Sequence, residues 1–212
     1  MSGGIVGVIV SAPVFLLGVI LHELAHAWAA YRLGDDTAKR AGRITLDPLA
    51  HLDPLGTIRF IVSSFAGFGF GWAKPVPVNP YNFRNVKRDQ LLVSLAGPSA
   101  NLLQAAAWAL LLRLAIGFPG LVPGEWLGSL VDFFLLGVII NVALLLFNLI
   151  PIPPLDGSRV IPWLFRLRDP LLMDRLAPIG FFALIIFIQT PLFGAIFGPL
   201  HRAIVGLLLR GA

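Results

Sequence analysis

The sequence predicts an all-α polytopic membrane protein with about four to six membrane helices and one re-entrant element of extended or β-hairpin form. The first two observations are compositional. Hydrophobic residues make up 57% of the 212 residues, and charged residues only 13%, whereas a soluble domain carries about a quarter charged residues. The third observation is a recurrence of long apolar stretches, one of which ends in closely spaced prolines.

The charge balance is basic because acids are few. Sixteen Lys and Arg residues stand against 11 Asp and Glu, which gives a net charge of +5. Although the chain is basic, its apolar composition argues against a nucleic-acid partner, and the lipid bilayer is the expected surrounding. The sequence contains no cysteine, so any metal site must use His, Asp or Glu. The length fits a single intramembrane domain over residues 1–212, and the oligomeric state stays open.

Residues 5–30, 91–116 and 127–150 are the clearest candidates for membrane-spanning helices. Each exceeds the roughly 20 apolar residues that a helix needs to cross the hydrocarbon core. Together with the loops between them they form a predicted core at about residues 5–160.

The C-terminal region, at about residues 176–210, is also apolar and is predicted to form further membrane helices. Thr190-Pro191 and Gly198-Pro199 interrupt it. One span with an interfacial helix and two short helices are both compatible with this pattern.

Residues 55–80 are interpreted as a re-entrant or hairpin element rather than a clean span. Arg59 and four glycines interrupt the apolar part, and Pro75, Pro77 and Pro80 forbid a helix at its end. Extended backbone at membrane depth is tolerated only against protein or a water-filled cavity.

The positive charges predict the topology. Residues 32–54, 73–90 and 157–177 hold twelve of the sixteen Lys and Arg, whereas residues 117–126 hold none. Positive loops face the cytoplasm, so the three basic loops share that side if residues 55–72 do not cross. The N-terminus is then outside.

The pattern His22-Glu23-Leu24-Ala25-His26 carries the strongest chemical signal. Residues four apart lie on one face of a helix, so the two imidazoles can bind one zinc ion. The intervening glutamate can take a proton from water at that ion. Because ionisable groups within a membrane segment are costly, they are functional by default.

A catalytic zinc needs a third protein ligand. Asp156 follows a proline-rich loop at the end of the third span, where the first span also brings His22 and His26. From spacing alone, a zinc ligand and a helix N-cap are equally good readings of Asp156. Asp47, His51 and Asp53 also cluster, but their Asp-Pro pairs favour turns over a second metal site.

These motifs give the chain a close resemblance to the site-2 proteases, a family of intramembrane zinc metalloproteases. The resemblance covers about residues 16–159. His22-Glu23-x-x-His26 matches the metal-binding helix of the family, and Leu155-Asp156-Gly157 matches its L-D-G signature, whose aspartate is the third zinc ligand. No segment has the length of an inserted PDZ domain or an appended nucleotide-sensing domain, so the chain resembles a minimal member.

Three further motifs extend the resemblance. Asn148 matches an asparagine that helps to position or polarise the scissile carbonyl, although an interhelical hydrogen bond is the alternative. Residues 71–77 resemble a re-entrant β-hairpin that holds the substrate in extended form, with a rigid structural loop as the alternative. Gly97-Pro98-x-x-Asn101 resembles the G-P-x-x-N motif of a core helix. Asn101 is expected to join helices or to orient a ligand.

The resemblance implies an intramembrane zinc endopeptidase that acts in regulated intramembrane proteolysis, with one zinc per chain and transmembrane proteins as substrates. The implied zinc ligands are His22, His26 and Asp156, with Glu23 as general base and then acid. The implied location is the plasma or inner membrane, with the site near the cytoplasmic side. The alternatives are an inactive, helix-binding pseudoprotease and a metal transporter.

Overall fold

The computed structural model describes residues 5–65, 74–167, 169 and 171–210. Within these residues, four helices are long and apolar enough to cross a membrane. They are α1 (Ile5–Arg32), α5 (Val86–Gly117), α6 (Gly124–Asn148) and α9 (Pro191–Leu208). The three spans predicted at residues 5–30, 91–116 and 127–150 are therefore helices of the expected length, which supports a membrane-embedded protein.

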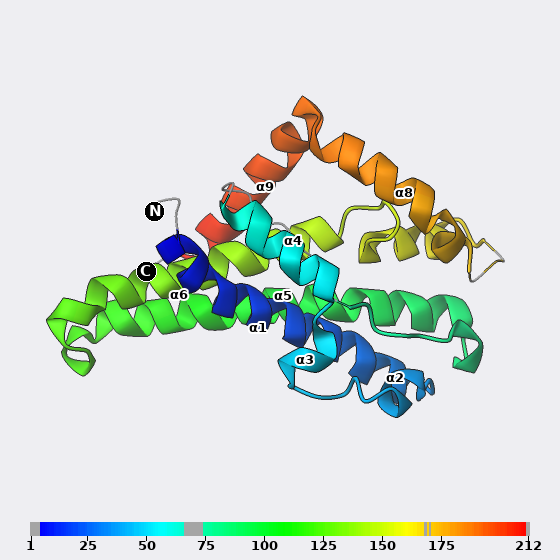
Figure 1. The fold of residues 1–212 in the computed structure, drawn as a ribbon, viewed down its shortest axis with the longest axis horizontal. Coiled ribbons are helices and arrows are strands. Elements are labelled where there is room, and N and C mark those ends of the chain that lie inside the picture. Colours follow the sequence, from blue (N-terminus) through cyan, green and yellow to red (C-terminus); the bar gives the residue numbers. More distant parts are fainter. Residues whose placement is uncertain (1–4, 66–73, 168, 170, 211–212) are drawn as a thin grey trace.

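Helices α5 and α6 form a long antiparallel pair, and α1 lies against both (Figure 1). The pair has a core of small and β-branched residues, in which Ala105 and Ala109 meet Val138 and Val142. Small side chains let helix backbones approach closely, which is how helices associate in lipid. This close packing sets the frame to which α1 is added.

The C-terminal region consists of two helices, α8 (Leu172–Ile188) and α9, which meet at an angle beside the α5–α6 pair (Figure 1). The break predicted at Thr190-Pro191 is confirmed, because Thr190 caps α9 by accepting from the N–H of Phe193 and Pro191 is its first residue. The second predicted break is wrong: α9 continues through Pro199. The guanidinium of Arg113 on α5 donates to the carbonyls of Leu208 and Arg210, where α9 ends.

Several short elements surround this frame. They are α2 (Thr37–Arg40), α3 (Pro48–His51), α4 (Pro54–Phe65), the 3₁₀ turns η1 (Pro80–Asn82), η2 (Pro119–Leu121) and η3 (Asp156–Arg159), and α7 (Val160–Leu164). Both Asp-Pro pairs that were predicted to be turns begin helices instead. Asp47 caps α3 by accepting from Leu49 N, and Asp53 accepts from Gly56 N at the start of α4. A proline in the first helical turn costs no hydrogen bond, which explains the difference.

His51 and Lys74 lie side by side. The N–H of Lys74 donates to the carbonyl of His51 over 2.8 Å. Helix α4, with 12 residues, is about 18 Å long, which is shorter than the hydrocarbon core. The predicted re-entrant β-hairpin is not shown by these residues. No strand occurs in the described ranges, and residues 66–73 of the expected hairpin lie outside them.

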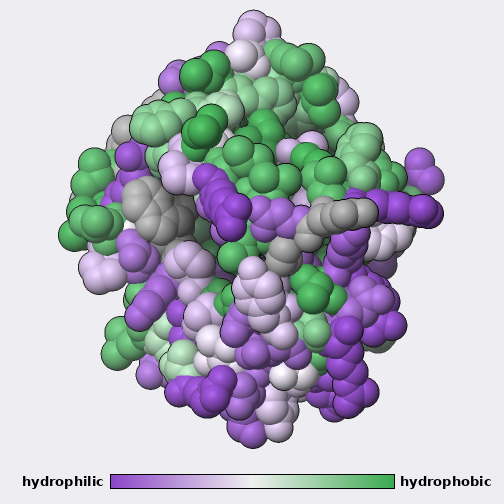
Figure 2. Space-filling view, turned by 90° about the vertical axis from the view of Figure 1, so that its right-hand side faces the viewer, coloured by the Kyte–Doolittle hydropathy of each residue, from purple (hydrophilic) through white to green (hydrophobic). Residues whose placement is uncertain are grey.

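The three basic loops lie at one end of the molecule. Arg43 of the first loop donates to carbonyls of the second, and Lys87 of the second donates to the carbonyl of Arg166 in the third over 3.0 Å. Figure 2 looks onto this end, where hydrophilic residues cover much of the lower part and hydrophobic residues most of the upper part. The three basic loops therefore lie together at one end of the molecule, as the charge pattern predicts.

Candidate metal centre

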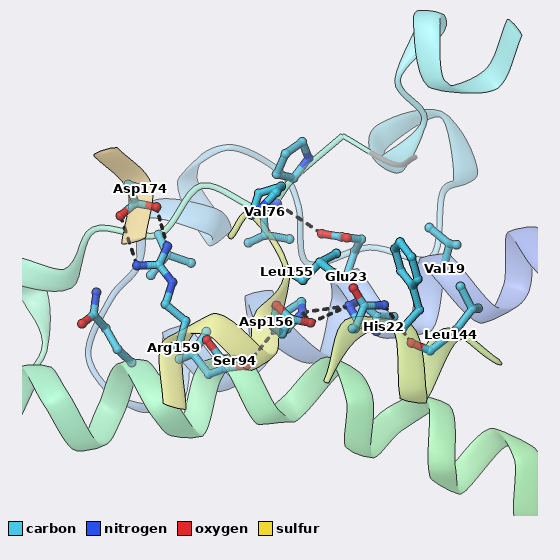
Figure 3. A pocket seen from close by; sticks show the side chains of 18 of the residues that line it. Val19, His22, Glu23, Val76, Ser94, Leu144, Leu155, Asp156, Arg159 and Asp174 are labelled. Carbon is cyan, nitrogen blue, oxygen red and sulfur yellow. Dashed lines mark hydrogen bonds and ion pairs between the residues drawn. The ribbon is translucent and has the colours of Figure 1, made fainter. Parts of the chain in front are cut away.

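Helix α1 presents His22 and His26 on the face that packs against α5. Both residues are buried, at 6% and 7% relative exposure. The 3₁₀ turn η3, which follows α6 in the chain, brings Asp156 to them (Figure 3). The third residue predicted from the sequence thus joins the first two.

The donor atoms of these three residues meet at one point. Nε2 of His22 and Nε2 of His26 each lie 3.2 Å from Oδ2 of Asp156, and 2.9 Å from one another. Ligand atoms about 2.0–2.1 Å from a tetrahedral zinc lie about 3.3 Å apart. The group is the one cluster of His, Cys, Asp and Glu within the described chain that could hold a metal ion.

The tautomers of both imidazoles follow from their second nitrogens. Nδ1 of His26 contacts the carbonyl of Val93 at 2.7 Å, and a carbonyl can only accept, so Nδ1 carries the proton. Nδ1 of His22 contacts Oδ1 of Asn101 at 2.6 Å, so it also donates. In the neutral imidazoles, both Nε2 atoms therefore present lone pairs.

These lone pairs face the Asp156 carboxylate, whose Oδ2 is buried and has no hydrogen-bond partner among the described residues. Three electron-pair donors thus converge with no hydrogen between them, an arrangement that a cation stabilises. Asp156 supplies the one negative charge of this donor set.

Gly97 of α5 makes room for both imidazoles. A Cβ at this position would lie 2.3 Å from Nε2 of His26 and 2.6 Å from Nε2 of His22. Any other residue would therefore push the ligand atoms away. The adjacent Pro98 has no N–H to donate to the carbonyl of Ser94, so this turn of α5 lacks one helical hydrogen bond. The close contacts explain the glycine of the motif.

Gly157, the residue after Asp156, also lies where a side chain would not fit. A Cβ there would lie 2.2 Å from the carbonyl oxygen of Leu149. The backbone after Asp156 thus packs directly on the end of α6, which fixes where the carboxylate points.

Asn101 connects the centre to two other helices. Its Nδ2 donates to the carbonyl of Gly18 on α1 and to Oδ1 of Asn141 on α6, both over 3.2 Å. Asn141 in turn donates to the carbonyl of Gly137. Both expectations for Asn101 are met, since it joins helices and also orients a ligand candidate.

Glu23 lies beside the three donors and lines the same cavity of about 970 Å³. Its Oε2 accepts a 3.2 Å hydrogen bond from the backbone N–H of Val76 (Figure 3). Arg159 and Asp174 form an ion pair at another part of the cavity wall. The cavity thus holds the metal donors, a carboxylate that can move protons, and an extended backbone segment.

Asn148 also lines this cavity. Its Nδ2 donates to the carbonyl of Leu144 in its own helix over 3.0 Å. Among the described residues, no hydrogen bond from Asn148 to another helix is found, which was the alternative. Its predicted role stays a prediction.

Other histidines lie outside the centre. His51 is buried and contacts the carbonyl of Thr45 through Nε2, and His201 contacts the carbonyl of Ile139. Sequence reasoning named Gly97 only as part of a motif and did not predict its contact with the imidazoles, whereas the interhelical hydrogen bond considered for Asn141 is present. Gly97 could have been found from its position four residues before Asn101, on the same helix face.

Comparison with known proteins gives relatives over most of the chain. The chain is 40% identical over 188 residues to "Putative zinc metalloprotease YwhC" of Bacillus subtilis strain 168, covering 89% of this chain and 84% of the relative. It is 32% identical over 185 residues to "Putative zinc metalloprotease Rip2" of Mycolicibacterium smegmatis, covering 84% and 65%. A third relative, "Putative zinc metalloprotease MJ0611" of Methanocaldococcus jannaschii, is 32% identical over 146 residues.

No family model and no solved structure matches the chain. The names of the relatives imply zinc, and the donor set of two imidazoles and one carboxylate fits that metal. With this similarity along most of its length, the chain belongs to the site-2 protease family of zinc metalloproteases.

Proposed function

We propose that this protein is an intramembrane zinc endopeptidase, which hydrolyses peptide bonds in or near transmembrane segments of membrane proteins. The observation that carries the proposal is the meeting of three metal donors beside Glu23, two of them on α1, a helix long enough to span a membrane, and the third on η3. The whole of residues 1–212 then forms one intramembrane domain, which takes part in regulated intramembrane proteolysis.

His22, His26 and Asp156 are the proposed zinc ligands. Two neutral imidazoles and one carboxylate leave a fourth position open, which is typical of catalytic rather than structural zinc. A zinc ion bound there supplies Lewis acidity, which lowers the pKa of water and polarises a carbonyl. The hydrogen bonds from Nδ1 of both histidines keep the Nε2 lone pairs aimed at the ion.

Glu23 is the proposed general base and then general acid. Its carboxylate lies in the cavity with the three donors, so it can take a proton from attacking water and deliver it to the leaving amine. Asn148, in the wall of the same cavity, is the proposed stabiliser of charge on the carbonyl oxygen of the scissile bond.

A substrate helix must unwind before its backbone can reach this site. Residues 74–79 contain no helix or strand, and Pro75, Val76 and Val78 line the cavity. We therefore propose that an unwound substrate segment lies along this stretch, in the manner of strand addition. The prolines cannot donate hydrogen bonds, so such pairing uses only part of the edge.

The proposed location is the plasma or inner membrane, with the centre near the cytoplasmic side. The three basic loops support this orientation, because they lie at one end of the molecule and Asp156 begins the turn that leads into the third of them.

Reconstitution into liposomes with zinc and a single-span substrate tests the proposal. Wild type should cleave, and Glu23→Gln should lose cleavage while retaining zinc, because glutamine cannot take up a proton. Asp156→Ala should lose bound zinc. Equal cleavage by wild type and Glu23→Gln would refute Glu23 as the base. Zinc that stays bound in Asp156→Ala would reject the third ligand.

A further inference from the structure

Residues 74–79 are held against the metal centre by the loop that follows α1. At one end, the N–H of Lys74 donates to the carbonyl of His51. At the other end, the N–H of Asn79 donates to Oδ2 of the buried Asp35 over 2.7 Å. Between these ends, Val78 packs on the cluster of buried residues that includes Ala30 and Val93.

The middle of this segment is held by Arg43. Nη1 of Arg43 donates to the carbonyl of Pro75 over 3.0 Å, and Nη2 donates to the carbonyl of Lys74. Arg43 is only 4% exposed, which is unusual for a charged side chain. No carboxylate forms a salt bridge with it among the residues that the structure describes.

One peptide group connects Arg43 to Glu23. The carbonyl of Pro75 and the N–H of Val76 belong to the same trans peptide, so they point in opposite directions. The carbonyl accepts from the guanidinium of Arg43, and the N–H donates to the carboxylate of Glu23 over 3.2 Å. The peptide dipole thus lies between a cation and an anion, with its ends matched to both.

The charges agree with this geometry. Burial lowers the pKa of the Arg43 guanidinium, and the carboxylate of Glu23 is the charge that acts against this effect. Arginine stays protonated in proteins, so the buried cation faces carbonyls on its near side and Glu23 beyond them. A lysine could not replace the two-pronged contact, because its ammonium is a single point of charge.

We propose that Arg43 is a positioning residue for catalysis, which fixes the Pro75–Val76 peptide and through it the orientation of the Glu23 carboxylate. The inference rests on the proposed protease function for its kinetic consequence, but the placement of the segment is testable without any activity.

The absence of cysteine allows a single-thiol probe of this placement. Val78→Cys introduces one thiol on the segment, and its rate of reaction with a maleimide is measured in detergent. In this background, Arg43→Gln should raise the rate by about fivefold or more, since hydrogen bonds to a charged group are lost. Arg43→Lys should give a smaller rise. The matched control is Arg40→Gln, whose arginine is exposed and pairs with Asp36, and it should change nothing.

Kinetics distinguish positioning from a merely structural role. Arg43→Gln should lower kcat by about 10- to 100-fold with zinc content unchanged and KM within about twofold. Arg43→Lys should restore part of kcat. An unchanged thiol rate in Arg43→Gln, a rise in KM with normal kcat, or a loss of zinc would each overturn the proposal. If the wild type cleaves no substrate, the proposed function fails. The thiol reaction rates then still show whether Arg43 holds residues 74–79 in place.

Discussion

Nδ1 of His22 donates a 2.6 Å hydrogen bond to Oδ1 of Asn101, which lies 79 residues further along the chain. The bond determines which imidazole nitrogen carries the proton, and it leaves Nε2 free to bind a cation. This contact between α1 and α5 therefore also orients a proposed metal ligand.

Replacing Asn101 with alanine should weaken zinc binding by about 10- to 100-fold. The Nδ1–H of His22 would lose its acceptor, and the carbonyl of Gly18 would lose a donor. Competition with a chelator in detergent measures the affinity. Leu102→Ala, at an exposed neighbour on the same helix, serves as the control and should bind zinc normally. Equal affinities in the two variants would contradict the role given to Asn101.

Gly97→Ala should weaken zinc binding by at least about tenfold. Its new Cβ would lie 2.3 Å from Nε2 of His26, so the imidazoles must move away from Asp156. Metal analysis of the purified protein measures the loss. Gly117→Ala is a matched control, because a Cβ at this last residue of α5 meets nothing within 4 Å. Full zinc content in Gly97→Ala would show that the helices can separate at no cost.

Asn148→Ala tests the proposed stabilisation of the carbonyl oxygen. Removal of one such donor lowers kcat by about 100- to 1,000-fold, and zinc content should not change because Asn148 is not a ligand. Initial rates at saturating substrate measure the effect, with Leu149→Ala, at a partly exposed neighbour, as the comparison. If Asn148 only donates its hydrogen bond to the carbonyl of Leu144 and does not contact the substrate, kcat will stay near the wild-type value.

Asp35 predicts a loss of stability in acid. Burial raises the pKa of its carboxyl, but hydrogen bonds from Thr37, Asn82 and Asn79 outweigh burial and hold the pKa below its ordinary value. A group with a depressed folded pKa stabilises the fold above its unfolded pKa, and this contribution is lost as the pH falls through the folded pKa.

The melting temperature in detergent should therefore be steady above about pH 5 and should decline below about pH 4. Asp35→Asn should melt about 5 °C or more lower at neutral pH, because donors lose a charged acceptor, and its decline in acid should be smaller. Asp36→Asn, which affects only an exposed pair with Arg40, should follow the wild type. Identical acid profiles for all three proteins would exclude Asp35 as the cause.

The sequence was most informative where chemistry depends on local spacing. His22 and His26 share a helix face by periodicity alone, and the break at Thr190 follows from a cap and a proline. Asp156 was ambiguous from its spacing, and the family motif decided in favour of a ligand. The structure then placed it against both imidazoles.

The remaining features depend on partners that are distant in sequence. Gly97 is required by two side chains about 70 residues earlier, and no local pattern encodes how close those imidazoles come. Arg43 was counted only as one of the basic loop residues, because its acceptors are backbone carbonyls, which every residue has. Helix α4 was missed for a different reason, since the Asp53-Pro54 pair suits both a turn and a helix start.

The three donors of the centre are also separated in the time of their synthesis. Helix α1 carries both imidazoles early in the chain, whereas Asp156 is made more than a hundred residues later, after α5 and α6. A metal ion held by all three donors can therefore be captured only once these helices have come together and Gly157 has seated on the end of α6. Full metal binding therefore requires the assembled helices, and a nascent chain that has not reached Asp156 lacks the third donor.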